Sequence, residues 1–191
     1  MEIKLKNAVI DYKESFFNPQ EADALFIDLR KKIDWKQDKI KMFGKIHNVP
    51  RLQAWYGDPD KSYTYSGLRM LPNQWNSLLL DVKDSIEKFS SEKFNSVLAN
   101  LYRDGNDSNG WHADDEKELG QNPIIASLSL GESRKFKMKH KFDKELTFDL
   151  ELKHGSLLIM KEETQHYWKH TIAKTKQRKE ERINLTYRYI Y

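Results

Sequence analysis

The feature that most constrains the fold of this chain is a change in the spacing of its apolar residues near residue 90. Before that point, two segments, 18–33 and 73–89, carry apolar side chains at the three- and four-residue spacing of an amphipathic helix. After it, apolar and polar residues mostly alternate in short runs, which are SVLANLY, IIASLSL, RKFKMKH, LTFDLEL, SLLIM and RINLTYRYI. Alternation places every second side chain on one face of a strand. We therefore predict a β-sandwich or jelly roll in the second half of the chain.

The size of the chain favours one folded unit. Its 191 residues suffice for one sizeable core and are few for two. We expect a single domain over residues 1–191, with helices and a cover segment over about 1–90 and the β core over about 91–191. No apolar run has the length of a signal peptide or a membrane span, so we expect an intracellular, cytoplasmic protein, nuclear if the source is a eukaryote, without membrane contact.

Charge and cysteine content limit the chemistry. Lys and Arg number 33 against 29 Asp and Glu, and this net charge of +4 mildly favours a polyanionic partner without establishing one. Cysteine is absent, which excludes disulfides, thiolate metal sites and a cysteine nucleophile. Any metal must therefore be held by histidine and carboxylate groups.

The segment GWHADDE, residues 110–116, places one histidine and three carboxylates close together. His112 and Asp114 lie on the same side of an extended chain, because the side chains of a strand change face at every residue. On its own, the segment is more typical of a solvated acidic loop, since it follows the turn-rich RDGNDSNG. This segment alone does not distinguish a metal site from a solvated loop, so the rest of the sequence is needed.

The last predicted strand has one apolar face and one polar face. The polar face carries Arg182, Asn184, Thr186 and Arg188. Two arginines on one face fit either the surface of an edge strand, which is the commoner case, or a clamp for an anion.

A metal site would explain both groups of residues together. Two imidazoles and one carboxylate leave metal positions for a keto acid and dioxygen, as in non-haem iron(II) oxygenases. Guanidinium groups would then bind the carboxylates of the keto acid. The residues alone leave four candidates for the second imidazole, which are His140, His154, His166 and His170.

Three segments, WHADDE, WKHTIAK and RINLTYR, together resemble the AlkB family of iron(II)- and 2-oxoglutarate-dependent dioxygenases, and in particular its branch that repairs alkylated nucleobases. Further similar segments occur in the family's order between about residue 40 and residue 191, and they are FGKIHNVPRLQAWYGD, SYTYSG, VLANLYRDG, PIIASLSLG and HGSLLIM. The resemblance implies a mainly β fold with flanking helices, a double-stranded β-helix (jelly roll) with an amino-terminal nucleotide-recognition cover.

The resemblance also implies the iron ligands and the cosubstrate contacts. It selects His170, twelve residues before Arg182, as the Fe2+ ligand beside His112 and Asp114. We expect the other three candidates, His140, His154 and His166, to be structural. Contacts to 2-oxoglutarate, which acts with dioxygen as cosubstrate, are implied for Asn100, Tyr102, Arg182, Asn184, Thr186 and Arg188.

Nucleic-acid contacts are implied for Phe43, Gly44, Arg51, Tyr63, Tyr65, Ser66, Asp115 and Glu116. Phe43, at the turn of a predicted two-stranded ribbon, would fill the gap left by a flipped base, although a turn residue packed against the protein also fits. Tyr65 would stack on the base. Asp115 and Glu116 would favour a cationic, methylated base, although Glu116 also fits a solvated turn. Arg51 would contact a phosphate or support the ribbon.

The implied reaction is oxidative demethylation of DNA bases of the 1-methyladenine and 3-methylcytosine type, coupled to decarboxylation of 2-oxoglutarate and release of formaldehyde, which is direct-reversal repair of alkylation. RNA demethylation by the same chemistry is the closest alternative. An oxygenase acting on protein or lipid would not need the base-pocket segments. A non-catalytic nucleic-acid-binding module would not need the metal and arginine set. We expect a monomer.

Overall fold

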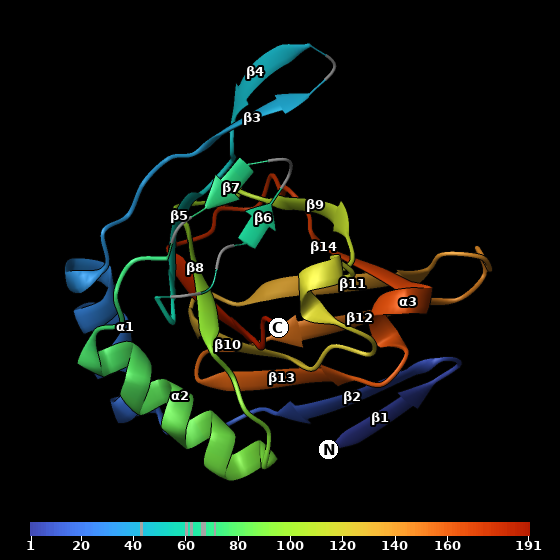
Figure 1. The fold of residues 1–191 in the computed structure, drawn as a ribbon, viewed down its shortest axis with the longest axis horizontal. Coiled ribbons are helices and arrows are strands. Elements are labelled where there is room, and N and C mark those ends of the chain that lie inside the picture. The colour runs from blue at the N-terminus through green and yellow to red at the C-terminus, as the bar shows by residue number, and fades with distance from the viewer. Residues whose placement is uncertain (43, 60, 62, 66–67, 71) are drawn as a thin grey trace.

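The computed structural model describes residues 1–42, 44–59, 61, 63–65, 68–70 and 72–191 (Figure 1). Among these residues, two antiparallel sheets form the body of the molecule. The larger sheet contains, in order, β1 (Glu2–Leu5), β2 (Ala8–Lys13), β13 (Ser156–Lys161), β10 (Ile125–Gly131), β15 (Arg182–Arg188), β8 (Ser96–Tyr102) and β5 (Leu52–Gly57). The smaller contains β12 (Thr147–Leu152), β11 (Arg134–His140), β14 (Trp168–Ile172) and β9 (Asn109–His112).

Two hairpins and a few helices complete the described structure. The hairpins are β3 (Lys39–Met42) with β4 (Lys45–Asn48), and β6 (Tyr63–Tyr65) with β7 (Leu68–Met70). The helical elements are α1 (Pro19–Lys32), α2 (Ser77–Ser90), the single turn α3 (Thr164–Tyr167) and a 3-10 turn, η1 (Lys117–Leu119). The β3–β4 hairpin projects from the body of the molecule (Figure 1).

Apolar side chains fill the space between the two sheets. Leu98 and Leu158 of the larger sheet share a buried cluster with Phe136, Met138 and Trp168 of the smaller one. Alternate residues of the same strands face the other way, as the period of two requires. Two facing antiparallel sheets with this core form the jelly roll that the alternating runs predicted.

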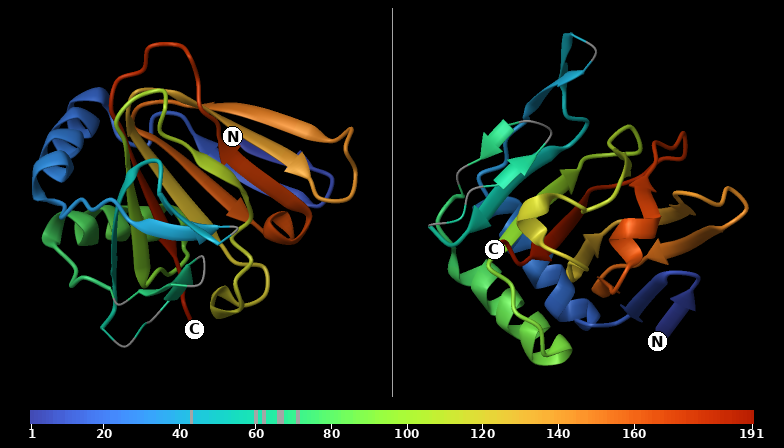
Figure 2. Two further views of the ribbon diagram at one scale, coloured as in Figure 1. Left: turned by 90° about the horizontal axis from the view of Figure 1, so that it is seen from above. Right: turned by 45° about the vertical axis from the view of Figure 1, so that its right-hand side comes forward.

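Helices α1 and α2 lie along the outer face of the larger sheet (Figure 2). Helix α1 begins where Asn18 and Glu21 form a capping box, in which each side chain accepts a hydrogen bond from the other residue's backbone N–H at 3.0 Å. Leu29 of α1 and Val82 of α2 join a second buried cluster with Leu185 of β15. Both helices therefore support the central strands from behind.

The sequence predicted both long helices, the ribbon strands β3 and β4, and the six strands that match its alternating runs. It did not predict β1, β2, β5, β6, β7, β9 and β14. In β5, LQAWYG, nearly every residue is buried, so its sequence lacks alternation. Strand β2 pairs with β13 near the opposite end of the chain. The larger sheet thus contains strands from both sides of residue 90.

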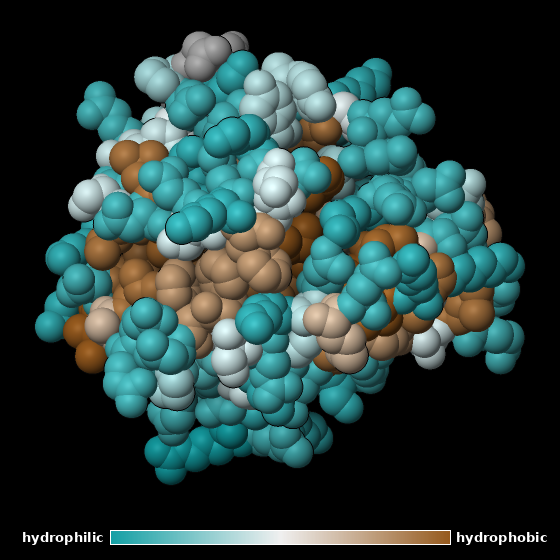
Figure 3. Space-filling model, turned by 90° about the horizontal axis from the view of Figure 1, so that it is seen from below, coloured by the Kyte–Doolittle hydropathy of each residue, from teal (hydrophilic) through white to brown (hydrophobic). Residues whose placement is uncertain are grey.

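Apolar side chains gather on the face that Figure 3 shows, which is the side of α2 and the β1–β2 hairpin. Phe89 of α2 is 50% exposed, and its ring centre lies 5.5 Å from that of Phe16. This side lies opposite the β3–β4 hairpin (Figure 1). None of the helices in the described ranges has the length and apolar character needed to cross a membrane.

Candidate metal centre and arginine clamp

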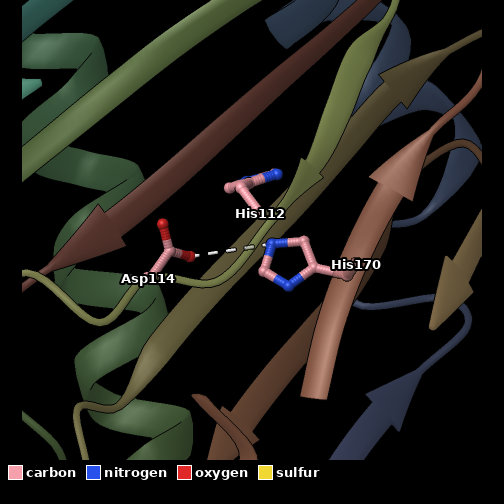
Figure 4. A group of neighbouring side chains, drawn as sticks. All are labelled: His112, Asp114 and His170. Carbon is pink, nitrogen blue, oxygen red and sulfur yellow. Dashed lines mark ion pairs between the residues drawn. The ribbon is translucent and has the colours of Figure 1, made fainter. Parts of the chain in front are cut away.

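Neighbouring strands of the smaller sheet bring one carboxylate and two imidazoles together. His112 ends β9, Asp114 follows two residues later, and His170 of β14 stands opposite His112 in the antiparallel pairing. Each side chain offers a ligand atom within 4.8 Å of the others (Figure 4). The two imidazole centres are 4.2 Å apart, and His170 Nε2 lies 3.8 Å from Asp114 Oδ2. The pairing of β9 with β14 thus brings His170 to the predicted pair.

Hydrogen bonds leave His112 with a nitrogen that can bind a metal. His112 Nδ1 lies 2.8 Å from the carbonyl oxygen of Gly110, and this contact places a proton on Nδ1 because a carbonyl only accepts. His112 Nε2 then carries the lone pair, which accepts a hydrogen bond from the side-chain amide of Asn109 at 3.2 Å, and a bound metal would take the place of that donor. Fixing one imidazole nitrogen in this way orients the other toward a ligand.

Asp114 is held in a defined orientation. Arg188 Nη2 donates to Asp114 Oδ1 at 2.7 Å, while Oδ2 faces His170. The backbone N–H of Asp114 donates to Gln165 Oε1 at 2.9 Å. Asp114 is 1% exposed, and Gln165 is fully buried. Arg188 therefore fixes the carboxylate, Gln165 fixes the backbone that carries it, and one carboxylate oxygen remains directed at His170.

The protonation states suit a cation. Burial by itself would raise the pKa of Asp114, but the charges of Arg188, His170 and His112 and the hydrogen bond from Arg188 together outweigh it, and the pKa falls to about 2. Burial, with repulsion from His112, lowers the pKa of His170 to about 3. At neutral pH, Asp114 is ionised and His170 is neutral, which are the forms that bind a metal.

The polar face of β15 points inward. Strand β15 lies between β10 and β8, and Arg182 and Arg188 are only 1% and 6% exposed. The alternative that these arginines lie on the surface of an edge strand is therefore wrong. Asn184 and Thr186 are buried with them. Asn184 Nδ2 donates to Ser127 Oγ at 2.8 Å, and Thr186 Oγ1 donates to Asn184 Oδ1 at 2.9 Å.

Arg182 lies at the opposite end of β15 from Arg188. Its Nη2 donates to Ser129 Oγ at 2.9 Å, and its Cζ lies 5.1 Å from the ring centre of Tyr102. In the described part of the chain, its Nε and Nη1 are buried without a hydrogen-bond partner. Burying a charged donor without an acceptor is costly. These atoms are therefore well suited to bind an anionic ligand.

Asn100 is buried on β8, but protein groups already contact it. Its Oδ1 accepts hydrogen bonds from Arg51 Nε at 2.7 Å and from Gln53 Nε2 at 3.0 Å. Arg51 is 3% exposed and also donates to the carbonyl oxygen of Ser108 at 3.0 Å. The geometry therefore favours a supporting role for Arg51 over a phosphate contact.

The other three candidate histidines make contacts with protein groups. His154 Nδ1 accepts a hydrogen bond from the backbone N–H of Gly131 at 2.7 Å, and His166 Nε2 accepts one from that of Asn122 at 3.3 Å. His140 is buried, and its ring stacks on Tyr167 with the ring centres 5.8 Å apart. None of the three belongs to the cluster of possible metal ligands. Their predicted structural role is therefore supported.

The predicted nucleic-acid contacts are only partly described. Phe43, Ser66 and the side chains of Tyr63 and Tyr65 lie outside the described residues. Gly44 has a φ of +77°, a backbone conformation that favours glycine in the turn between β3 and β4. Asp115 is exposed and its carboxylate lies 2.8 Å from Lys141 Nζ, while Glu116 is half-buried.

Three buried polar residues around the site were not predicted from the sequence. Gln165 holds the backbone of Asp114, and Ser129 binds Arg182. The third, Arg134, is 3% exposed on β11. Only Arg134 had a signal, because a charged residue stands on the face of RKFKMKH that otherwise carries Phe136 and Met138.

Comparison with known proteins gives the class of the protein. Residues 10–188 match the model of the 2OG-Fe(II) oxygenase superfamily. The fold is similar to that of OsALKBH1, with a TM-score of 0.60 at 15% identity, covering 99% of this chain and 100% of that chain. It is also similar to a 2OG-Fe(II) oxygenase-family oxidoreductase from Burkholderia pseudomallei, with a TM-score of 0.62 at 12% identity, covering 96% and 85%. The jelly roll, the ligand cluster and the family match define a 2OG-Fe(II) oxygenase.

Two relatives are much closer in sequence. Alpha-ketoglutarate-dependent dioxygenase alkB homolog 3 from Bos taurus is 43% identical over 185 residues, which cover 92% of this chain and 64% of the relative. DNA oxidative demethylase ALKBH2 from Mus musculus is 40% identical over 184 residues, which cover 91% and 77%. This chain belongs to the AlkB family of 2OG-Fe(II) oxygenases. Membership implies Fe2+, 2-oxoglutarate and dioxygen. The chain spans less than two thirds of the length of the alkB homolog 3 relative.

Proposed function

We propose that this chain demethylates N-alkylated bases in DNA, of the 1-methyladenine and 3-methylcytosine type, and so directly repairs alkylation damage. The observation that carries the proposal is the convergence of His112, Asp114 and His170 beside two buried arginines on one face of β15. The names of the relatives, a dioxygenase and a DNA oxidative demethylase, support the reaction and the substrate.

The ligand cluster fits iron(II), with two imidazoles on adjacent strands and one ionised carboxylate two residues after β9. His112, Asp114 and His170 would hold the metal, which together with 2-oxoglutarate supplies the dioxygen-dependent oxidation of the methyl group. Arg188 holds one oxygen of Asp114, so the other stays directed at the metal position. These side chains position the reactants and transfer no proton, because a hydroxylated N-methyl group loses formaldehyde without a protein nucleophile.

Each of the two arginines would bind one carboxylate of the keto acid. Arg188 contacts Asp114 and therefore lies at the metal end, where it would stabilise the carboxylate next to the keto group. Arg182, with two buried unpartnered donor atoms among the described residues, would bind the distal carboxylate beside Tyr102. Asn100, Asn184 and Thr186 would complete the pocket wall.

The base would enter from the side of the β3–β4 hairpin. Every described residue of β4 is exposed, whereas apolar patches occupy the opposite side of the molecule (Figure 3). From the sequence, Phe43 would replace the flipped base in the duplex, and Tyr65, with Tyr63 and Ser66 beside it, would stack on the base. Asp115 and Glu116 would favour its cationic methylated form.

A turnover assay tests this function. Purified protein with iron(II) and 2-oxoglutarate is given matched oligonucleotides that carry 1-methyladenine or 3-methylcytosine, as single-stranded DNA, duplex DNA and RNA. We expect formaldehyde and unmodified base in proportion to succinate, and neither product from unmethylated controls. Turnover on RNA alone would replace the proposal with RNA demethylation. No turnover on any methylated substrate would reject it.

The protein would bind nucleic acid as a monomer. Sedimentation of the protein alone and with an oligonucleotide measures this directly, and we expect one copy of the chain in each species. A stable dimer in the absence of nucleic acid would contradict this part of the proposal.

A further inference from the structure

Two buried guanidinium groups lie over one tyrosine ring at the end of β8. The Cζ atoms of Arg182 and Arg134 are 5.1 Å and 5.6 Å from the ring centre of Tyr102. Arg182 is 1% exposed and Arg134 is 3% exposed. Cations over an aromatic face are attracted to it, and more so away from water. Arg134, which has no part in the mechanism above, therefore belongs to the surroundings of the distal carboxylate.

The hydrogen bonds of Arg134 connect the two segments next to the metal-ligand strands. Its Nη1 donates to the carbonyl oxygen of Asp104 at 3.1 Å, and its Nη2 donates to those of Asp107 and Ala173 at 2.9 and 2.8 Å. Asp104 and Asp107 lie in the loop that leads into β9, and Ala173 follows β14 directly. Strands β9 and β14 carry the two histidines of the proposed metal site. One side chain thus ties both segments to Tyr102.

In the described structure, the guanidinium of Arg134 is not hydrogen-bonded to a carboxylate, because its three hydrogen bonds go to neutral carbonyl groups. The nearby carboxylate of Asp107 is bound by Arg103 through bonds of 2.7 and 2.9 Å. Glu132 is bound by Lys179 at 2.9 Å. Burial, together with the positive charge of Arg134, lowers the pKa of Arg182 to about 10. An anion in contact with Arg182 would therefore be attracted by both arginines.

We propose that Arg134 is a positioning and specificity-determining residue for the distal carboxylate of 2-oxoglutarate. The carbonyl groups fix its guanidinium, the guanidinium fixes the ring of Tyr102, and its charge adds to the attraction of Arg182. This inference rests on the proposed function, in which Arg182 binds that carboxylate. A keto acid with only one carboxylate lacks the group that Arg134 acts on, so its binding would not depend on Arg134.

Calorimetric titration of the full chain, loaded with Mn2+ in place of iron, measures this selectivity without turnover. The two probes are 2-oxoglutarate and 2-oxobutyrate, which share the keto acid end and differ in the distal carboxylate. In Arg134→Gln, we expect the dissociation constant for 2-oxoglutarate to rise about tenfold and that for 2-oxobutyrate to stay within about twofold. Arg134→Lys keeps the charge but loses the planar fork, and we expect a rise of about threefold for 2-oxoglutarate only.

Arg103→Gln is the matched control, because it loosens the same loop at Asp107 while leaving Arg134 in place. It should leave the ratio of the two dissociation constants unchanged. If Arg134→Gln lowers the melting temperature but leaves that ratio at the wild-type value, Arg134 is only structural and the inference is wrong. Should Arg134→Gln fail to fold, the ratio in Arg134→Lys decides in the same way. A wild-type protein without preference for 2-oxoglutarate would instead reject the proposed keto acid site itself.

Discussion

At the scale of single residues, the site depends on polar groups whose partners come from distant parts of the chain. Arg182 and Arg188 share one face of β15, yet one binds a serine hydroxyl and the other binds the carboxylate of Asp114. The same residue type therefore has two different environments on one strand. Replacing each arginine in turn should therefore have different effects on metal binding, because of the two only Arg188 contacts a proposed metal ligand.

Replacing Asp114 by Ala removes the charged member of the metal site. We expect loss of iron binding and of succinate production, measured by metal analysis and product assay. The melting temperature should also fall, because the guanidinium of Arg188 loses its buried carboxylate partner. Asp149→Ala, which changes an exposed carboxylate on β12, is the control and should keep the bound iron. Wild-type succinate production by Asp114→Ala would reject the assignment.

Neutral substitutions of the two arginines should have different effects. Arg188→Met should weaken both metal and 2-oxoglutarate binding, since Arg188 orients Asp114 and lies at the metal end. Arg182→Met should weaken 2-oxoglutarate binding while leaving metal affinity unchanged. The loss of a charge-assisted hydrogen bond of this kind costs about 1.5–3 kcal/mol, or roughly 10- to 100-fold in affinity. Titrations with Mn2+ and then with 2-oxoglutarate measure both. Equal metal affinities in the two variants would contradict this division of roles.

At the scale of elements, the loop between β8 and β9 determines how the ligand His112 is presented. The Asp107 side chain, 5% exposed, closes this loop by accepting the side-chain and backbone hydrogen bonds of Arg103. Arg134 fixes the same loop from the other side through the carbonyl groups of Asp104 and Asp107. The loop is therefore held by ionic and backbone contacts.

The stability of this loop should depend on pH through Asp107. Burial alone would raise the pKa of Asp107, but the hydrogen bonds and charge of Arg103 outweigh it, and the pKa is lowered from 3.8. A lowered folded-state pKa stabilises the protein fully above the unfolded value, and this contribution is lost as the pH falls through the folded value. Between about pH 5 and about pH 3, the wild-type melting temperature should fall more than that of Asp107→Asn. Parallel pH profiles of the two proteins would contradict this role of Asp107.

At the scale of the whole molecule, the two ends have different surfaces. The β3–β4 hairpin projects at one end with exposed residues on β4, and apolar patches lie at the other end on the side of α2 (Figures 1 and 3). A phosphate backbone favours a polar and basic surface. We therefore expect the nucleic acid to contact the hairpin end. The role proposed for Phe43 depends on this contact.

Phe43→Ala should reduce demethylation of duplex DNA much more than that of single-stranded DNA. A duplex must lose stacking and pairing before its methyl group reaches the site, whereas a single strand needs little help. Binding of 2-oxoglutarate and uncoupled turnover should stay unchanged. Ile46→Ala, which alters an apolar residue 71% exposed on β4, is the matched variant for general damage to the hairpin. Equal losses of Phe43→Ala on both substrates, or no loss on either, would reject the duplex role.

The sequence by itself determined the two long helices, the strands of the alternating runs and the pair of possible metal ligands at residues 112 and 114. Its helix-spaced segments became α1 and α2, its alternating runs became core strands, and His112 with Asp114 kept the shared side that the period of two requires. These features are local, because they depend on residues a few positions apart. The resemblance then supplied His170 and the family, and both agree with the structure and the comparisons.

Only the tertiary structure decided which distant groups meet. The pairing of β9 with β14 placed His170 against His112, and the central position of β15 buried both arginines instead of leaving them on an edge. The division between Arg182 and Arg188, and the place of Arg134 beside Tyr102, follow from contacts between residues far apart in sequence. Local periodicity assigns a side chain to a face of a strand, but only the packing of the two sheets determines what lies opposite that face.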